Sequence, residues 1–396
     1  MSRPGAGGAW RDAGVNMLSP GRWSRSVRRR LRSIERRLRE ARMFARAMVS
    51  RNHPIVAQIV PIRRCNLACA YCNEFDAVSA PVPLDRMQKR VDLLAGLGTT
   101  IITISGGEPM LHPDLEAIVR RIRSHGAIAT LITNGYLLTA ERIRGLNRAG
   151  LDYLQISIDN VLPDDTSKKS LKTLDLKLQL LAEHAEFSVT VNSVLGSAVR
   201  NPQDARTIAI RAKHLGLAST VGILHDGRGQ VQPLAPDHVA IYLDLLEPDQ
   251  KMFSFAQFDQ FQSNIAQGRP NRWHCRAGGR FLYVCEDGLV HYCSQQRGHP
   301  GISLDRYTRE HLERESAREK PCAPYCTISC VHQTAMLDSF RENPREVLLQ
   351  MIAARQQRNP SYRPPALLKV LRWMFLEGPV NRTLSKAAMR VLRVSR

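Results

Sequence analysis

Six short apolar stretches, rich in β-branched side chains, recur along the chain and constrain its fold more than any other feature. They occupy residues 55–61, 100–105, 128–133, 153–158, 188–194 and 219–224. The segments between them, such as 84–97 and 115–123, place apolar residues at helical spacing. Because strands that alternate with helices pair in parallel, we predict either an open doubly wound sheet or a full or partial β/α barrel. In both architectures ligands bind at the carboxyl ends of the strands.

The nine cysteines fall into three tight groups that lie far apart in the sequence. The groups are Cys65, Cys69 and Cys72, then Cys275, Cys285 and Cys293, then Cys322, Cys326 and Cys330. Such clustering indicates metal or iron–sulfur ligation in a reducing compartment, not a disulfide framework. We therefore treat all nine thiols as candidate metal ligands.

The first group directly follows the first predicted strand, which places its three thiols at the mouth of the predicted sheet. Three thiolates on so short a loop can hold three irons of a 4Fe-4S cluster and leave the fourth iron open. An open iron suits a cluster that binds a small chelating molecule and passes one electron into it. A structural zinc or an ordinary ferredoxin-like site is the alternative for the triad alone.

Around this group the sequence resembles the signature of the radical S-adenosylmethionine (radical SAM) enzymes. The matching residues are Cys65, Asn66, Leu67, Cys69, Tyr71 and Cys72. The resemblance implies that S-adenosylmethionine binds the open iron and is cleaved to a 5′-deoxyadenosyl radical, which abstracts a hydrogen atom. With the six βα units, it favours a partial (β/α)6 TIM-type barrel.

Further matches to the same family follow the later strands. Residues 105–109 resemble its glycine-rich motif, and the resemblance assigns Gly106, Gly107, Glu108 and Pro109 to the methionine amino group. It also suggests cofactor contacts at strand ends and beside the adenine. These candidates are Tyr71, Asn134 with Gly135, Ser157, Asp159 and Asn192. For Ser157, Asp159 and Asn192, capping of the following helix is an equally good interpretation.

The second and third cysteine groups resemble the auxiliary-cluster extension called SPASM or twitch. Cys275, Gly288 and Cys293 match its opening, while the last group resembles its end without two of the cysteines of the full pattern. Six thiols can complete one 4Fe-4S cluster. We expect Cys275, Cys293 and Cys330 as ligands, Cys285 next, and Cys322 and Cys326 either on a second, incomplete cluster or spare.

A structural zinc site is the alternative for this region, because zinc accepts four thiolates at similar spacings. His274, His299 and His332 flank the cysteines and could each replace a thiol.

The net charge of +21 lies mostly at the two ends of the chain. Residues 1–52 carry 14 arginines against three acids, and residues 341–396 carry 12 Arg or Lys against three acids. Within them, residues 27–48 and 367–392 have the pattern of basic amphipathic helices. These helices could lie on an anionic membrane, bind nucleic acid, or pack on the barrel with a solvated charged face. Nucleic acid is the least favoured, since no aromatic–basic interleaving accompanies the charge.

We therefore predict four parts. Residues 1–52 form a basic, partly disordered extension with an amphipathic helix, 53–235 the barrel, 236–340 the auxiliary-cluster domain, and 341–396 a basic helical extension. No apolar run approaches the roughly 18 residues that span a bilayer, and no secretory signal is evident. We therefore expect a cytoplasmic protein. Peripheral contact with the inner face of the membrane is a second expectation.

The predicted activity is hydrogen abstraction from a small-molecule or lipid-linked substrate. Reduced flavodoxin or ferredoxin is the expected electron donor. Asn73, Glu74, His225 and Asp226 lie near the predicted barrel mouth and are candidate substrate contacts. The first alternative is a maturase that modifies a ribosomally made peptide or protein, and the second is a non-catalytic iron–sulfur or zinc interaction protein.

Overall fold

A computed structural model describes residues 20–225, 232–245 and 256–358, together with a few positions between 360 and 387. The candidate Asp226, most of the predicted disordered tail and most of the predicted helix at 367–392 lie outside the described residues. Among the described helices, none is long and apolar enough to cross a membrane.

The centre of the fold is a nine-stranded sheet in the order β6-β5-β4-β3-β2-β1-β7-β8-β9. Strands β1 to β7 are parallel, whereas β8 and β9 are antiparallel. The strands are β1 Val56–Ile59, β2 Ile101–Ile104, β3 Ile128–Thr133, β4 Tyr153–Ser157, β5 Ser188–Leu195, β6 Ala218–Ile223, β7 Phe281–Val284, β8 Leu289–His291 and β9 Pro300–Ser303. Since β6 and β9 are edges, the sheet stays open, and the predicted partial barrel is confirmed.

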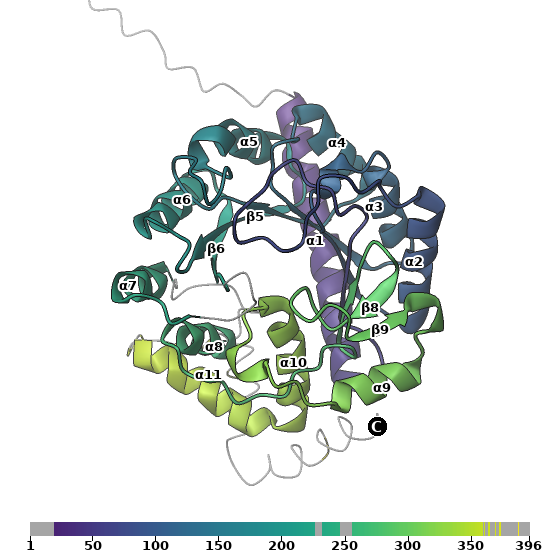
Figure 1. Ribbon diagram of the computed structural model, residues 1–396, viewed down its shortest axis with the longest axis vertical. Coiled ribbons are helices and arrows are strands. Elements are labelled where there is room, and N and C mark those ends of the chain that lie inside the picture. The colour runs from purple at the N-terminus through teal and green to yellow at the C-terminus, as the bar shows by residue number, and fades with distance from the viewer. Residues whose placement is uncertain are drawn as a thin grey trace, which may run out of the picture.

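Helices α2 to α6 form an outer arc around the first six strands (Figure 1). They are α2 Leu84–Leu97, α3 Leu115–Ser124, α4 Ala140–Ala149, α5 Leu171–His184 and α6 Gln203–His214. All six predicted strands are present. The first is shorter than the predicted 55–61, because Pro61 has no N–H with which to continue the ladder.

The two faces of the parallel strands differ in polarity. Alternate residues such as Ile59, Ile104 and Ile156 are fully buried against the helices in the main apolar core. The intervening residues point to the concave side and are largely polar. They include Gln58, Thr103, Thr130, Gln155, Thr190 and Asn192, all partly exposed. The period-2 pattern of the strands thus gives an apolar outer layer and a polar interior.

The Cys-rich region adds to the same sheet, because β7 pairs in parallel with β1. Five further helices of the described chain, α7 to α11, lie on the side of the barrel that the arc of α2 to α6 leaves open, in the lower half of Figure 1. They are α7 Pro236–Leu245, α8 Ala256–Ala266, α9 Arg309–Ala317, α10 Ser329–Glu342 and α11 Pro344–Arg358. Short 3-10 turns occur at Pro109–Leu111, Leu304–Arg306 and Ala323–Tyr325.

The predicted basic helix at 27–48 is present as α1, Pro20–Val49. Its end is joined to the Cys-rich region by Arg280, which is completely buried before β7. The Arg280 Nε lies 3.0 Å from Asp338 Oδ2 of α10, and its Nη1 donates to the carbonyl of His53 at 2.8 Å. Burial lowers the pKa of Arg280 to about 10. Its Nη2 also donates to the carbonyl oxygen of Ala47 at 3.3 Å, so this buried arginine holds the end of α1, the start of β7 and α10 together.

We expect Asp338→Ala to lower the free energy of unfolding by about 3–5 kcal/mol, because it leaves the buried Arg280 without its counter-ion. The matched control is Asp244→Ala, which removes an exposed partner of Arg206 and should cost less than about 1 kcal/mol. Urea unfolding of the full chain, followed by circular dichroism, measures both. Equal losses in the two variants would contradict this role for the pair.

Candidate functional site

The loop between β1 and α2 holds the first three thiols at the carboxyl end of the sheet. Its backbone is fixed on both sides, because Cys65 N–H donates to Asp76 O at 3.1 Å and Ala70 N–H donates to Thr166 O at 2.9 Å. Cys69 is buried, whereas Cys65 and Cys72 are partly exposed. Burial raises the pKa of Cys65, and it raises the pKa of Cys72 to about 11. Thiolates here therefore require a nearby positive charge, such as that of a metal.

Polar groups surround these sulfur atoms. Leu67 N–H donates to Cys65 Sγ at 3.4 Å, and Asn134 Nδ2 donates to the same sulfur at 3.7 Å. Ser167 Oγ lies 3.6 Å from Cys69 Sγ. Donors to sulfur stabilise thiolate ligands and tune the potential of iron–sulfur clusters. Asn134, predicted as a cofactor contact, thus lies beside the thiol of Cys65, and Ser167 is a neighbour of Cys69 that sequence analysis did not identify.

Gly106 and Gly107, at the end of β2, pack directly on the backbone of the cysteine loop. A Cβ at Gly107 would lie 2.1 Å from the carbonyl oxygen of Arg63, and one at Gly106 would lie 2.5 Å from that of Ile62. Gly106 also has φ of +129°, which other residues rarely adopt. Gly107 N–H donates to Ile62 O at 3.2 Å. Both glycines are therefore needed for the close contact between these two loops.

Glu108 is fully buried and joins the ends of β2 and β3. Its Oε1 accepts from Met110 N at 2.9 Å and from Thr133 Oγ1 at 2.7 Å, while Oε2 accepts from Asn134 N at 2.7 Å. Burial raises the pKa of Glu108, and these hydrogen bonds oppose that shift. The carboxylate therefore positions the two strand ends, and Pro109 begins the short turn that follows it.

Tyr71 and Lys169 meet at one carboxylate oxygen of Asp159, and Lys169 is a residue that sequence analysis missed. Tyr71 O–H donates to Asp159 Oδ2 at 2.5 Å, and Lys169 Nζ lies 2.9 Å from that same oxygen. Asp159 Oδ1 is buried and accepts no hydrogen bond from the described residues. A cavity of about 180 Å³ opens beside them, lined also by Ser167 and Val194. The buried, unsatisfied oxygen and the neighbouring aromatic ring make this cavity a candidate cofactor site.

Ser157 and Asn192 lie opposite each other in the register of β4 and β5. Asn192 Oδ1 accepts from Thr220 Oγ1 of β6 at 3.0 Å. Both residues are partly exposed on the polar concave side of the sheet. They belong to the lining of the barrel interior and do not cap a helix.

Three of the predicted mouth residues are joined to the Cys-rich region. Asn73 Nδ2 lies 3.5 Å from Gln295 Oε1, and His225 contacts the same glutamine side chain. Glu74 accepts a hydrogen bond from the hydroxyl of Tyr283 in β7. Burial raises the pKa of Glu74. Residues after β1, β6 and Cys293 thus meet at one edge of the barrel mouth.

Four thiols of the Cys-rich region form one electrostatically coupled set, here called the thiol tetrad: Cys275, Cys293, Cys322 and Cys326. Burial raises the pKa of all four thiols, and the charges of Cys275, Cys293 and Cys322 each raise the pKa of at least one other member further; together these effects connect all six pairs. Burial raises the pKa of Cys293 to about 12. Among the described residues, no three of these sulfurs lie within 4.8 Å of one another.

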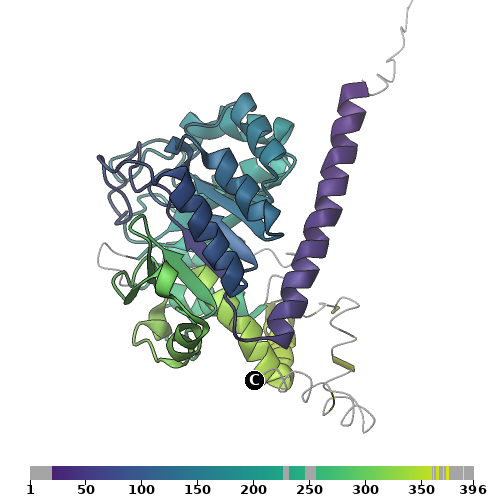
Figure 2. The same cartoon turned by 90° about the vertical axis from the view of Figure 1, so that its right-hand side faces the viewer.

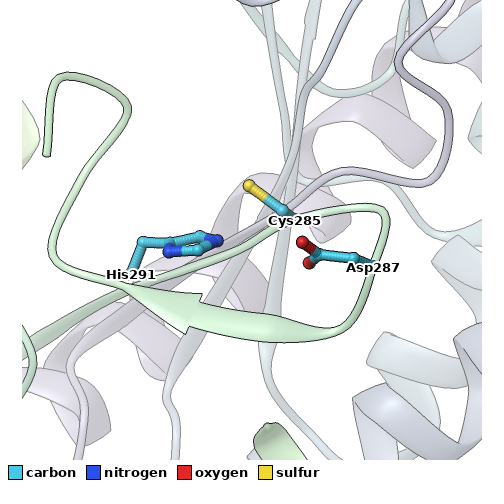
Figure 3. Close-up of side chains that lie close together, drawn as sticks. All are labelled: Cys285, Asp287 and His291. Carbon is cyan, nitrogen blue, oxygen red and sulfur yellow. The ribbon is translucent and has the colours of Figure 1, made fainter. Parts of the chain in front are cut away.

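Cys285 and Cys330 lie outside the tetrad. Burial raises the pKa of Cys330 to about 12, and its side chain packs against the buried cluster that contains Cys275, Cys285 and Cys293. Cys285 lies with Asp287 and His291 on the β7–β8 hairpin, their ligand atoms within 4.8 Å of one another (Figure 3).

His291 makes this hairpin set a poor metal site. Its Nδ1 accepts a hydrogen bond from Gly298 N–H at 2.9 Å. The neutral ring therefore carries its proton on Nε2 and has no second lone pair to offer a metal.

Lys320 places a buried positive charge beside the tetrad. Its Nζ lies 3.4 Å from the carbonyl oxygen of Cys275 and 4.7 Å from the centre of the Tyr292 ring. Burial lowers the pKa of Lys320, whereas the charges of Cys275 and Glu315 raise it. This residue has no counterpart among the sequence predictions.

Residues 59–195 match the model of the radical SAM superfamily. This range contains the three loop thiols, the glycine pair and Asp159. A PqqA peptide cyclase from Ruegeria pomeroyi is 26% identical over 266 residues, which cover 64% of this chain and 71% of the relative. A GTP 3′,8-cyclase from Chlorobaculum tepidum is 30% identical over 158 residues, covering 38% of this chain and 48% of the relative. The chain thus spans about half the length of that cyclase.

The fold is also similar to that of native anSMEcpe, whose structure was solved with bound AdoMet and the Cp18Cys peptide. The TM-score is 0.51 at 14% identity, and the match covers 77% of this chain and 100% of the other. At this identity the likeness concerns the fold alone.

We expect Gly107→Ala to remove about four irons per chain after anaerobic reconstitution, because the new Cβ would displace the cysteine loop. The control is Gly96→Ala in α2, where a Cβ has no neighbour within 4 Å and favours the helix. Iron and sulfide analysis measures both variants. Full iron content in the Gly107 variant would show that the loop tolerates the displacement.

Proposed function

We propose that this chain, a radical SAM protein by its match over residues 59–195, is an enzyme that cleaves S-adenosylmethionine reductively and takes a hydrogen atom from a peptide substrate. The observation that carries the proposal is the loop of Cys65, Cys69 and Cys72 held against the glycine pair at the carboxyl ends of β1 and β2. We also propose reduced flavodoxin or ferredoxin as the electron donor, and a cytoplasmic location, which suits nine free thiols.

The three loop thiols would hold a 4Fe-4S cluster. With S-adenosylmethionine on its open iron, such a cluster supplies one-electron cleavage and the 5′-deoxyadenosyl radical. The chain's own residues shape this site, since Leu67 N–H, Asn134 and Ser167 surround the sulfurs. Ser157 and Asn192, on the concave surface, are proposed contacts further inside the barrel.

The cofactor would extend from the glycine segment toward the cavity beside Tyr71. The carbonyl oxygens of Gly106 and Gly107 accept no hydrogen bond from the described residues, so they can accept from an ammonium group. The ring of Tyr71 offers a stacking surface, and the unsatisfied Oδ1 of Asp159 offers an acceptor for a hydroxyl. Lys169 keeps the other oxygen of Asp159 occupied. Glu108 would act as a positioning residue through its bonds to both strand ends.

A peptide is the better supported substrate class. The match to the PqqA peptide cyclase spans 266 residues and so must extend beyond the 137 residues at 59–195. The polar concave side of the sheet suits a hydrated chain more than a lipid tail. A small molecule is the second candidate, supported by the similarity to a GTP 3′,8-cyclase.

We further propose one auxiliary 4Fe-4S cluster on the thiol tetrad, a revision of the ligand set expected from spacing. Four mutually coupled thiols provide one ligand for each iron. Cys322 and Cys326 replace Cys285 and Cys330 in this assignment.

Cys69→Ala should abolish 5′-deoxyadenosine formation, because the cluster loses one of its three thiol ligands. The assay is liquid chromatography of an anaerobic reaction with S-adenosylmethionine and dithionite. Cys285→Ala is the matched control and should keep the activity. If the wild type binds the cofactor but never cleaves it, the chain is an interaction protein and not an enzyme.

Iron analysis separates the two ligand sets. Wild type should hold about eight irons, the Cys322→Ala/Cys326→Ala variant about four, and the Cys285→Ala/Cys330→Ala variant about eight. If the Cys285→Ala/Cys330→Ala variant loses about four irons instead, the ligand set expected from spacing is correct. About twelve irons in the wild type would indicate a second auxiliary cluster.

The substrate class is tested by following hydrogen. Deuterated cell extract is divided into a peptide fraction and a small-molecule fraction, and each is incubated with the reconstituted enzyme. Deuterium should enter 5′-deoxyadenosine from the peptide fraction, because the abstracted atom stays on that product. Transfer from the small-molecule fraction alone would favour the second candidate.

Lys320→Met should make the reduction potential of the auxiliary cluster more negative, because a buried cation close to the tetrad favours the reduced state. Redox titration monitored by EPR measures the shift. Lys89→Met, at an exposed position of α2, should leave the potential unchanged. An unchanged potential in the Lys320 variant would mean that its charge does not reach the cluster.

A further inference from the structure

We propose that α1 docks this protein on an anionic membrane surface through an apolar stripe that faces away from the barrel. Helix α1 lies on the opposite side of the sheet from the cysteine loop, along the right of Figure 2. The inference rests on the surface of this helix alone and is independent of the proposed reaction.

The basic side of α1 faces inward. Arg32 Nε lies 2.8 Å from Glu186 Oε2, just before β5, and Arg39 Nη2 lies 2.5 Å from Asp152 Oδ1, just before β4. Arg29 donates to the carbonyl oxygen of Ala185 at 2.7 Å. The side chains of Glu186 and Asp152 are 9% and 3% exposed, so these arginines neutralise buried acids at the amino ends of the strands. They are consequently unavailable for an external partner.

The apolar side of the same helix faces outward. Val27 is 37% exposed, Leu31 55%, Ile34 49% and Leu38 62%, and the spacing of three or four residues places them along one line. Val49, at the far end of α1, is 55% exposed and extends this line. The stripe is about 33 Å long at 1.5 Å per residue. A packed surface helix normally has the reverse arrangement, with its apolar stripe toward the core.

Arginines border the apolar stripe on both sides, and their positive charge indicates which kind of surface the stripe binds. Arg30 and Arg37 lie along one border and Arg42 along the other, all exposed and without an ion pair among the described residues. A narrow apolar line between unpaired arginines matches an interfacial helix, whose apolar side chains enter the acyl boundary while the guanidinium groups meet phosphates. An anionic lipid surface therefore fits better than a neutral protein groove.

Docking through α1 also fixes the orientation of the protein. The cysteine loop lies at the carboxyl ends of the strands and α1 at their amino ends (Figure 2). The barrel mouth would consequently face away from the bilayer, and substrate would enter from water.

The test is sedimentation of the full-length protein with vesicles of phosphatidylcholine alone or with one third phosphatidylglycerol. Wild type should bind the anionic vesicles at least tenfold more than the neutral ones, and salt should weaken the binding. Leu31→Ser/Leu38→Ser and Arg30→Gln/Arg37→Gln/Arg42→Gln should each lower the bound fraction at least tenfold. Leu176→Ser in α5, 71% exposed outside the stripe, is the matched control and should bind as wild type does.

Three results would overturn the proposal. If the wild type does not bind anionic vesicles, α1 has no membrane-docking surface. If the Leu31→Ser/Leu38→Ser variant binds as the wild type does, the lipid-binding surface lies outside α1. A dimer that becomes monomeric in that variant, without lipid dependence, assigns the stripe to a second copy of the chain. Unchanged iron content and circular dichroism confirm that each variant is folded.

Discussion

The backbone contact between the glycine pair and the cysteine loop is the constraint on which the rest of this site depends. The loop has no regular secondary structure of its own around Cys65 to Cys72. Its position comes from Gly107 against the carbonyl oxygen of Arg63, and from Asp76 and Thr166, which accept from the loop backbone. Glu108 then ties the same segment to β3. The three thiols are thus held by neighbouring strand ends more than by their own sequence.

The Cys-rich region is rigidly related to this loop because both extend from one sheet. β1 leads into the cysteine loop and pairs with β7, which leads to Cys285 and the β8 hairpin. The contact between Tyr283 and Glu74 joins the two segments again at the barrel mouth. A frame of this kind gives the two thiol groups a constant separation, as electron transfer or shared substrate binding would require.

Sequence pattern predicted the elements well, whereas spacing alone does not decide which thiols of the Cys-rich region share a site. The strands and α2 follow from β-branched runs and helical spacing, and the glycine segment from its place after β2. The proposed tetrad is not evident from spacing, because β9 and α9 separate Cys293 from Cys322 in the chain. Lys169 and Lys320 carry no recognisable motif. The inward arginines of α1 were equally hidden, since only tertiary structure shows the buried Glu186 and Asp152 that bind them.

The pairing of β1 with β7 has a consequence for biosynthesis. More than 200 residues separate these neighbours, so at ribosomal rates β1 stays an open edge for on the order of 10–40 s before β7 is made. An uncovered apolar strand of a parallel sheet can pair with other chains. The edge of β1 that β7 covers in the complete sheet is therefore open to pairing with other chains throughout that interval, and the sheet becomes complete only long after the first cysteine loop has been made.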